Sequence, residues 1–262
     1  LALNYGATRG YSEENPNVRV LFGSGDGAFH IVENTATSGR ESGREVFGFF
    51  PRETLSIIPW RRQGTGTSTG TSANSGLARR YGVDGAPVVL RVDLNGDGTL
   101  DAAAGDEAYA YFGLRRGGHS YFALDISNPD AVPTLKWKIS RSNGGDFDEL
   151  GLTFATPLVG KVNYSGVPVD VLVFAGGYDG GWNEDYSARR GKDQNAEDDA
   201  VGNAIYIVNA RTGELVWKAV RGETGTSSDT RYQHAGLVDS IPSAVSALLT
   251  PAGIIHRFYV GD

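Results

Sequence analysis

The sequence contains no cysteine among its 262 residues, which excludes disulfide bonds, thiolate metal sites and a thiol nucleophile. It also lacks any run of about 18 apolar residues, the length that a membrane-spanning helix requires. Basic residues are in the minority, with 24 lysines and arginines against 31 aspartates and glutamates, so the net charge is −7. This balance argues against nucleic acid as a partner and suits a surface that binds cations.

Glycine, by contrast, is abundant, and its 37 residues are double the usual share of about 7%. Without a collagen-like period, glycine at this level indicates many tight turns and therefore many short strands. The hydrophobic content of 40% and the charged content of 21% are typical of a globular protein. Because the chain starts at Leu1 without a methionine or signal peptide and ends abruptly at Asp262, we expect a piece of a longer protein.

A pattern of strand-forming residues occurs three times along the chain. Its centre is an apolar hexamer, found without gaps at Ala28–Glu33, Ser120–Asp125 and Ala204–Asn209. A β-rich segment ending in glycines precedes each hexamer, at Val18–Gly27, Ala108–Gly118 and Asp170–Gly177. A strand with a central aromatic residue follows each one, at Glu45–Phe49, Leu135–Ile139 and Leu215–Ala219. A further strand with a proline at its start is expected at Ala86–Val89, Thr156–Val159 and Ile241–Val245.

A recurring unit of four antiparallel strands is the pattern of a β-propeller blade. Equivalent positions lie 92 residues apart (Phe29 to Tyr121) and then 84 apart (Tyr121 to Ile205), whereas standard blades need about 40–50 residues. We therefore predict an all-β fold, a modified β-propeller with four-stranded blades and long inserted loops that is incomplete in this chain. Residues 1–262 would form part of one propeller domain, with about three blades and the start of a fourth. A two-layer β-sandwich, which also has many short strands, is the alternative.

Three inserted segments can be located between the strands. Pro51–Trp60 is predicted to form one short helix, with Leu55, Ile57 and Ile58 available to pack on a blade edge. Thr65–Gly76 is of low complexity. Trp182–Val201 is a polar excursion, and its acidic part, Asp193–Asp199, lacks the glycine that lets a short loop close round an ion. We expect that part to be a solvated surface loop.

The most specific chemical signal is the stretch D-L-N-G-D-G-T-L-D at Asp93–Asp101. Thr99, at its seventh position, offers a backbone carbonyl, and Gly98 allows the sharp turn needed at the sixth. Three carboxylates in nine residues repel one another unless a positive charge lies between them. A hard dication that accepts six to eight oxygens at about 2.3–2.6 Å meets this need. We therefore predict a Ca²⁺ site whose ligands are Asp93, Asn95, Asp97, Thr99 and Asp101.

This loop is not an EF-hand, because the twelfth position holds Ala104 instead of a bidentate glutamate. Strand-like segments flank it, Pro87–Val92 and Glu107–Gly113, and a compact loop of this kind resembles the calcium loops in the β-propeller of integrin-type adhesion proteins. The alternative is an acidic Asx turn between two strands, since Asp, Asn and Gly are also turn residues. Magnesium fits less well, because Mg²⁺ keeps several waters and seldom accepts an all-protein cage.

The sequence shows no catalytic constellation. It has no G-x-S-x-G elbow, its four histidines are not at metal-ligand spacing, and no histidine is paired with a nucleophile. The glycine clusters do not resemble a phosphate loop. His30 occupies the repeat position of Phe122 and Tyr206, which predicts a packing role on a strand face. We therefore expect a binding or structural protein and not an enzyme.

Gly202–Trp217 resembles the A-x-D-x-x-T-G-x-x-x-W repeat of quinoprotein propellers, in which the T-G turn links two strands and the tryptophan docks one blade on the next. The chain as a whole is more similar to the PilY/PilC family of type IV pilus biogenesis proteins and tip adhesins. The matching segments follow the family's order and are Gly25–His30, Gly43–Arg52, Arg80–Val88, His119–Ile126, Phe174–Tyr178 and Gly202–Trp217. The resemblance covers nearly all 262 residues.

The resemblance implies a decorated β-propeller that binds Ca²⁺ through the Asp93–Asp101 loop and helps control pilus extension against retraction. Members of the family also act in surface attachment and twitching motility. The expected partners are type IV pilus components (pilins and minor pilins) and a host surface, with no nucleic acid. The expected location is the bacterial cell surface, reached through the periplasm and outer membrane.

Two alternative functions stay open at this point. The first is a quinoprotein dehydrogenase fragment, although such enzymes draw calcium ligands from separate blades and many use adjacent cysteines that this chain lacks. The second is a generic adhesion propeller that binds a host protein or glycan.

Overall fold

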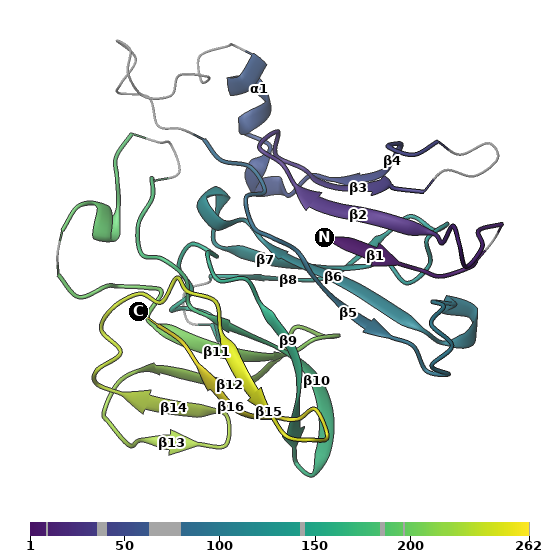
Figure 1. Cartoon of the computed structure of the whole chain (residues 1–262). Coiled ribbons are helices and arrows are strands. Elements are labelled where there is room, and N and C mark those ends of the chain that lie inside the picture. The colour runs from purple at the N-terminus through teal and green to yellow at the C-terminus, as the bar shows by residue number, and fades with distance from the viewer. Residues whose placement is uncertain are drawn as a thin grey trace.

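Strands account for nearly all of the regular structure, and they form successive sheets along the chain (Figure 1). The computed structural model describes residues 1–8, 10–35, 41–62, 80–141, 145–183, 187–195 and 197–261. The first antiparallel unit contains β1 (Ala2–Asn4), β2 (Val18–Gly23), β3 (Phe29–Glu33) and β4 (Glu45–Phe49). The second contains β5 (Val88–Val92), β6 (Glu107–Gly113), β7 (Ser120–Asp125) and β8 (Thr134–Ser140). The third contains β9 (Leu158–Tyr164), β10 (Val167–Ala175), β11 (Ala204–Asn209) and β12 (Leu215–Arg221).

The three units share one internal register, as expected for a repeated blade. At the hairpin between the second and third strands the facing pairs are Gly23 with Phe29, Gly113 with Tyr121, and Ala175 with Ile205. Each unit also has a register shift at the equivalent place of its third strand, between Ile31 and Val32, Ala123 and Leu124, and Ile207 and Val208. The central aromatics of the fourth strands, Phe47, Trp137 and Trp217, face the residue just before that shift. The predicted four-stranded unit is therefore confirmed.

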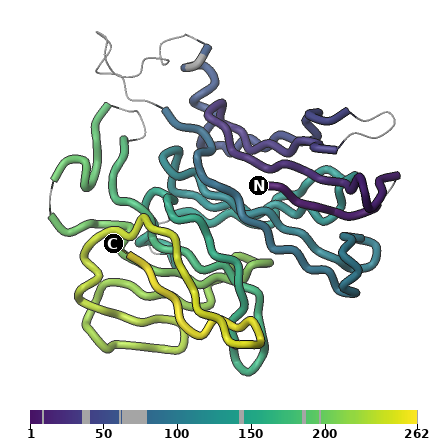
Figure 2. Tube along the Cα trace, viewed as in Figure 1, coloured from purple at the N-terminus to yellow at the C-terminus, as the bar shows by residue number. Residues whose placement is uncertain are grey.

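The second unit is buried on both faces. Successive residues of a strand point to opposite sides of a sheet, so each of its strands can contribute to two apolar clusters. Tyr121 on β7 belongs to the apolar cluster shared with the third unit, and Phe122 belongs to the cluster shared with the first. Phe112 on β6 stacks on Phe29 of β3, with ring centroids 4.2 Å apart. The units thus pack face to face, in the order purple, teal and green in Figure 2.

Backbone hydrogen bonds also join neighbouring units. Val83 N donates to Ser24 O at 3.0 Å, and Thr153 N donates to Gly118 O at 3.2 Å. Ile241 donates to Gly202 O and accepts from Gly177 N, both at 3.0 Å. The approach is so close that a Cβ on Gly202 would lie 2.6 Å from the Ser240 side chain, and Gly202 has a φ of +87°. Glycine at these turns therefore lets one unit dock on the next.

One predicted strand, Ile241–Val245, is wrong. The next strand, β15 (Ser246–Leu249), begins only after it and pairs with β16 (Ile255–Tyr259). The N–H and C=O of Ile241 are engaged by the third unit, and Pro242 has no N–H to give to a ladder. The third sheet also has more strands than predicted. β14 (Arg231–His234) pairs with β12 in parallel, and β13 (Ser227–Ser228) pairs with β14.

The segment Pro51–Trp60 forms a 3₁₀ turn, η1 (Arg52–Thr54), followed by α1 (Ile57–Arg62), and not the single helix that was predicted. Ile57 is buried as expected, whereas Leu55 and Ile58 are 46% and 39% exposed. The other helical turns are η2 (Ala102–Ala104), η3 (Arg115–Gly117) and η4 (Gly191–Asp193). Thr65–Gly76 lies outside the described residues. Within the described ranges, no helix is long and apolar enough to cross a bilayer.

Candidate metal centre

The Asp93–Asp101 segment joins β5 to β6 at one end of the second unit, as the sequence predicted. Asp93 directly follows β5, and the helical turn η2 separates Asp101 from β6. Gly96 and Gly98 adopt φ values of +70° and +85°, a left-handed conformation that other residues rarely take. These two glycines allow the chain to curl back on itself within a few residues.

The side-chain oxygens of the first part of the loop accept hydrogen bonds from the backbone that follows them. Asp93 accepts from Gly96 N at 2.8 Å through Oδ1 and from Gly98 N at 2.9 Å through Oδ2. Asn95 Oδ1 accepts from Asp97 N at 3.1 Å. Asp97 Oδ1 in turn accepts from Thr99 N at 2.7 Å. The loop is therefore a series of Asx turns that wrap round the Asp93 carboxylate.

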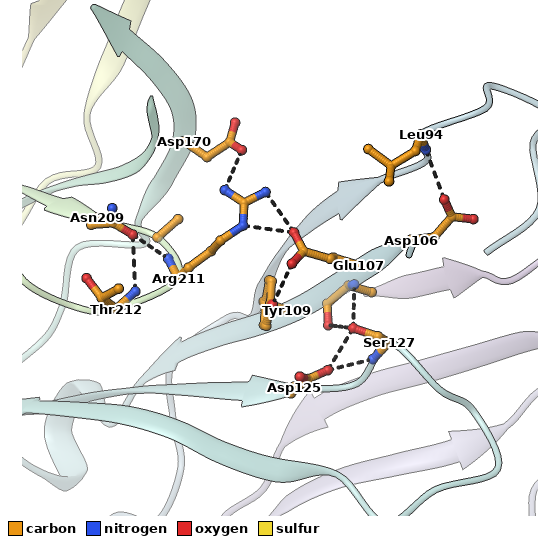
Figure 3. A network of polar contacts seen from close by, with 12 residues as sticks. Leu94, Asp106, Glu107, Tyr109, Asp125, Ser127, Asp170, Asn209, Arg211 and Thr212 are labelled. Carbon is orange, nitrogen blue, oxygen red and sulfur yellow. Dashed lines mark hydrogen bonds and ion pairs between the residues drawn. The ribbon is translucent and has the colours of Figure 1, made fainter. Parts of the chain in front are cut away.

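Asp101 and Asp106 close the loop at its far end. Asp101 Oδ1 caps η2 by accepting from Ala103 N at 2.9 Å. Asp106, which is 4% exposed, accepts from Leu94 N through Oδ1 at 2.9 Å (Figure 3). Its Oδ2 accepts from Asp101 N, also at 2.9 Å. The hydrogen bond from Asp101, followed by that from Leu94, holds the pKa of Asp106 below its usual range. Asp106 was not among the predicted residues, because nothing in its local sequence marks it.

A basic side chain also contacts the loop. Arg91 Nη2 donates to the backbone carbonyl of Gly98 at 2.7 Å and lies 3.3 Å from Asp93 Oδ2. Arg91 lies on β5, two residues before Asp93. Residues two apart in an extended chain point to the same side, so the two side chains can meet. The acidic loop thus already has one positive charge beside its first carboxylate.

The donor set fits a hard cation in its chemistry. Asp93, Asn95, Asp97, the Thr99 carbonyl and Asp101 offer oxygen atoms only, and a carboxylate that accepts one N–H keeps further acceptor positions. The described part of the chain contains no group of three or more His, Asp or Glu side chains placed to hold a metal ion. The three loop aspartates therefore share one loop without converging on one centre, and their hydrogen bonds hold the loop instead.

A charged network next to the loop ties the second unit to the third (Figure 3). Glu107, the neighbour of Asp106, accepts from Arg211 Nε at 2.8 Å and from Nη2 at 2.7 Å. Arg211 Nη1 lies 2.7 Å from Asp170 Oδ2 on β10. Burial, reinforced by the hydrogen bond that its hydroxyl donates to Glu107, raises the pKa of Tyr109 to about 12. One arginine from the β11–β12 turn therefore bridges two sheets.

Two other sequence interpretations are corrected by the structure. Asp193–Asp199 is not simply solvated, because Asp199 is 4% exposed and its Oδ2 accepts from Ser240 N at 2.6 Å. Lys192 Nζ lies 3.5 Å from Asp199 Oδ1 and 2.8 Å from Asp239 Oδ1, which pins the inserted segment to the chain before β15. His30 does pack, since its ring stacks on Phe22, but both its ring nitrogens also contact carboxylates.

These features define a class of protein, namely one built of four-stranded antiparallel blades that stack face to face, with an oxygen-rich loop on one of them. A family model described as the PilY1 beta-propeller domain matches residues 4–235. The chain therefore belongs to the PilY1 β-propeller family, as the resemblance in its sequence predicted. In the part of the chain that the structure describes, the sheets do not close into a ring, which is consistent with an incomplete propeller.

Known proteins agree with this assignment. The type IV pilus biogenesis factor PilY1 of Pseudomonas aeruginosa (strain UCBPP-PA14) is 32% identical over 145 residues, which cover 55% of this chain and 10% of that protein. The crystal structure of the Pseudomonas aeruginosa PilY1 C-terminal domain superposes with a TM-score of 0.57 at 18% identity, covering 99% of this chain and 43% of that one. The superposition and the description of the family model together support the propeller and not the sandwich. The chain thus spans about a tenth of the curated relative and less than half of the solved domain.

A quinohemoprotein alcohol dehydrogenase from Comamonas testosteroni also superposes, with a TM-score of 0.33 and 13% identity over 84% of this chain and 30% of that one. An overlap this low carries no inference about quinone chemistry. The curated relative, in contrast, is named as a type IV pilus biogenesis factor.

Proposed function

We propose that this chain is the calcium-binding propeller portion of a type IV pilus biogenesis factor at the bacterial cell surface. Membership of the PilY1 β-propeller family supports the pilus role. The observation that carries the calcium role is the oxygen-lined loop between β5 and β6, with its two left-handed glycines. The proposed ligands are Asp93, Asn95, Asp97, the Thr99 carbonyl and Asp101, and a bound Ca²⁺ supplies the positive charge that links them.

In this proposal the ion fixes the conformation of the loop between the ends of β5 and β6, and so selects one surface for a partner. The partners are type IV pilus components, pilins or minor pilins, with a host surface as a second one. The protein is exported through the periplasm and outer membrane and helps set the balance between pilus extension and retraction. Twitching motility and surface attachment depend on that balance.

The energetics suit a site outside the cell. Extracellular calcium modules bind in the range of about 10⁻⁴–10⁻³ M, so millimolar external calcium fills a loop that cytosolic calcium leaves empty. An ion that binds only the folded state adds about 0.4–1.4 kcal/mol of stability at about 1–10 times its dissociation constant, the range that millimolar calcium reaches here. That amount is enough to hold one loop conformation over several others.

The first test is the Asp97→Ala variant. Asp97 is exposed and its Oδ1 accepts one backbone N–H within the loop, so the variant is expected to fold. The melting temperature of the wild type should rise when EDTA is replaced by millimolar calcium, and this rise should be absent in Asp97→Ala. Asp229→Ala, which removes an exposed carboxylate elsewhere, should keep the full rise. Calorimetric titration of the wild type without heat, together with no shift in melting temperature, would count decisively against calcium binding.

The pilus role needs a test in the full-length protein and its native cell. Asp97→Ala there should change the number of surface pili and the extent of twitching at millimolar calcium, while the variant protein accumulates to the normal level. Asp229→Ala serves again as the control. Normal piliation and twitching in Asp97→Ala cells would separate calcium binding from pilus control.

A further inference from the structure

Arg91 contacts the proposed calcium loop in a way that bears on its affinity. Its Nη2 lies 3.3 Å from Asp93 Oδ2, and the side chains of Arg91 and Asp93 are 34% and 10% exposed. The same Oδ2 accepts from Gly98 N, so the arginine approaches an oxygen that the loop has already oriented. A permanent positive charge therefore lies against the first proposed ligand, since arginine does not lose its proton in proteins.

Arg91 also holds the backbone that leads to another proposed ligand. Its Nη2 donates to the Gly98 carbonyl at 2.7 Å, while the N–H of Thr99, in the same peptide group, donates to Asp97 Oδ1 at 2.7 Å. Both polar atoms of this peptide are engaged, so the plane that precedes the Thr99 carbonyl is fixed.

We propose that Arg91 is the internal counter-cation of this loop, which neutralises Asp93 when calcium is absent and lowers the affinity for calcium when it is present. The inference rests on the proposed calcium function and deepens it. A cation close to a ligand oxygen repels an incoming dication and competes for the electron pairs of that oxygen. The same contact spares the ion-free loop the mutual repulsion of its carboxylates.

The two contacts of Arg91 predict opposite results when the charge is removed. If its charge decides, loss of that charge tightens calcium binding. If its hydrogen bond to Gly98 decides, loss of the side chain loosens the peptide before Thr99 and weakens binding. We expect tighter binding, because the charge acts directly on a ligand, whereas the peptide before Thr99 keeps its second hydrogen bond to Asp97.

The experiment compares Arg91→Gln with Arg91→Lys, using calcium as the only added ligand. Glutamine removes the charge but can still donate to a carbonyl, and lysine keeps the charge but loses the planar fork. Arg257→Gln, at an exposed position on β16, changes the net charge equally and leaves the loop untouched. Calorimetry gives the calcium dissociation constant at low salt and at about 1 M salt, where the Debye length falls to about 3 Å. Melting in EDTA gives the stability of the ion-free protein.

The expected result is a dissociation constant about tenfold lower for Arg91→Gln at low salt, which corresponds to about 1.4 kcal/mol, with a smaller difference at high salt. Arg91→Lys and Arg257→Gln should both stay near the wild-type value. In EDTA, Arg91→Gln should melt below the wild type, because its loop has lost the counter-charge.

The results that contradict the proposal are distinct from those that contradict calcium binding itself. Wild-type protein that binds no calcium overturns the proposed function and this inference with it. Wild-type binding combined with unchanged or weaker binding by Arg91→Gln overturns this inference alone. If Arg91→Gln does not fold, Arg91→Lys decides, since binding tighter than wild type in a variant that keeps the charge would rule out a role for the charge.

Discussion

At the scale of single residues, the carboxylate of Asp106 holds the Asp93–Asp101 loop near both of its ends. It accepts one hydrogen bond from Leu94, just after β5 (Figure 3), and one from Asp101, just before η2. Leu94 and Asp101 are thus tied to one side chain at the start of β6. The ends of the loop need no ion to be brought together, so a bound cation would act on the conformation between them.

The position of the loop between β5 and β6 could be predicted from sequence, and its candidate ligands form a local pattern of oxygen-bearing residues at alternate positions. Their binding of calcium stays a prediction. Asp106 and Arg91 could not be predicted in the same way. Their roles depend on β5 and β6 lying side by side, with Val92 facing Glu107, which is a property of the folded sheet. The role of His30 was only partly predicted for a similar reason. Its partners Asp26 and Glu45 come from the turn before β3 and from the next strand.

His30 gives a pH-dependent prediction. Its Nδ1 lies 2.6 Å from Glu45 Oε1 and its Nε2 lies 3.1 Å from Asp26 Oδ2. Burial lowers the pKa of His30, but the hydrogen bonds to Glu45 and Asp26 outweigh it and raise that pKa above 6.5. The stabilisation is therefore fully present below about pH 6.5 and is lost as the pH rises through the raised value. His30→Gln should lower the free energy of unfolding more at about pH 6 than at about pH 9.

Urea unfolding at the two pH values measures this difference. His256→Gln, at an exposed position on β16, is the matched control for replacing a histidine outside this contact. An equal loss at both pH values for His30→Gln would show that the histidine contributes packing on Phe22 alone.

At the scale of elements, each fourth strand of a unit carries an aromatic residue that faces the next unit. Trp137 on β8 donates from Nε1 to Ala210 O at 3.0 Å, and the hydroxyl of Tyr111 donates to the same oxygen at 3.0 Å. Gly213, in the β11–β12 turn, lies directly against the indole. The sequence repeat predicted both the turn and the tryptophan, but it could not show that the turn receives the tryptophan of the preceding unit.

This contact predicts a steric cost at Gly213. A Cβ there would lie 2.8 Å from Trp137 Cγ, whereas a Cβ on Gly253 would meet nothing within 4 Å, and both glycines have a φ of +75°. Gly253→Ala should therefore cost about 1 kcal/mol for the left-handed backbone alone. Gly213→Ala should cost about 1–3 kcal/mol more, because the indole must move in a packed interface. Denaturant unfolding of both variants gives the two values, and equal losses would mean that Trp137 yields freely.

At the scale of the whole molecule, cohesion between units depends on contacts that join distant parts of the chain. The hydrogen bond from Arg211 to Glu107 spans 104 residues. The order of the four-stranded units could be predicted, because each unit is formed by strands that are consecutive in the sequence. This long-range pairing could not, because Arg211, Glu107 and Asp170 carry no mark that singles them out among the other charged residues.

The arginine bridge gives a prediction for stability. The Arg211 side chain is 36% exposed, so solvent screening reduces its worth below that of a fully buried pair. Arg211→Met should lower the free energy of unfolding by about 1–2 kcal/mol. Arg221→Met breaks an ion pair with Asp198 in which both side chains are exposed, and it should change the free energy by less than about 0.5 kcal/mol. Similar losses in the two variants, measured by chemical denaturation, would show that Arg211 contributes no more than a surface pair.

The main-chain hydrogen bonds between successive units bear on how such a protein can change over time. Val83, Thr153 and Ile241 are held by peptide groups of the preceding or following unit, and a peptide group is the same whatever residue carries it. The side chains around these hydrogen bonds can therefore be substituted during evolution while the contacts between units are kept. A protein assembled in this manner can diverge widely in sequence and still superpose on a distant relative, as the 18% identity and TM-score of 0.57 illustrate.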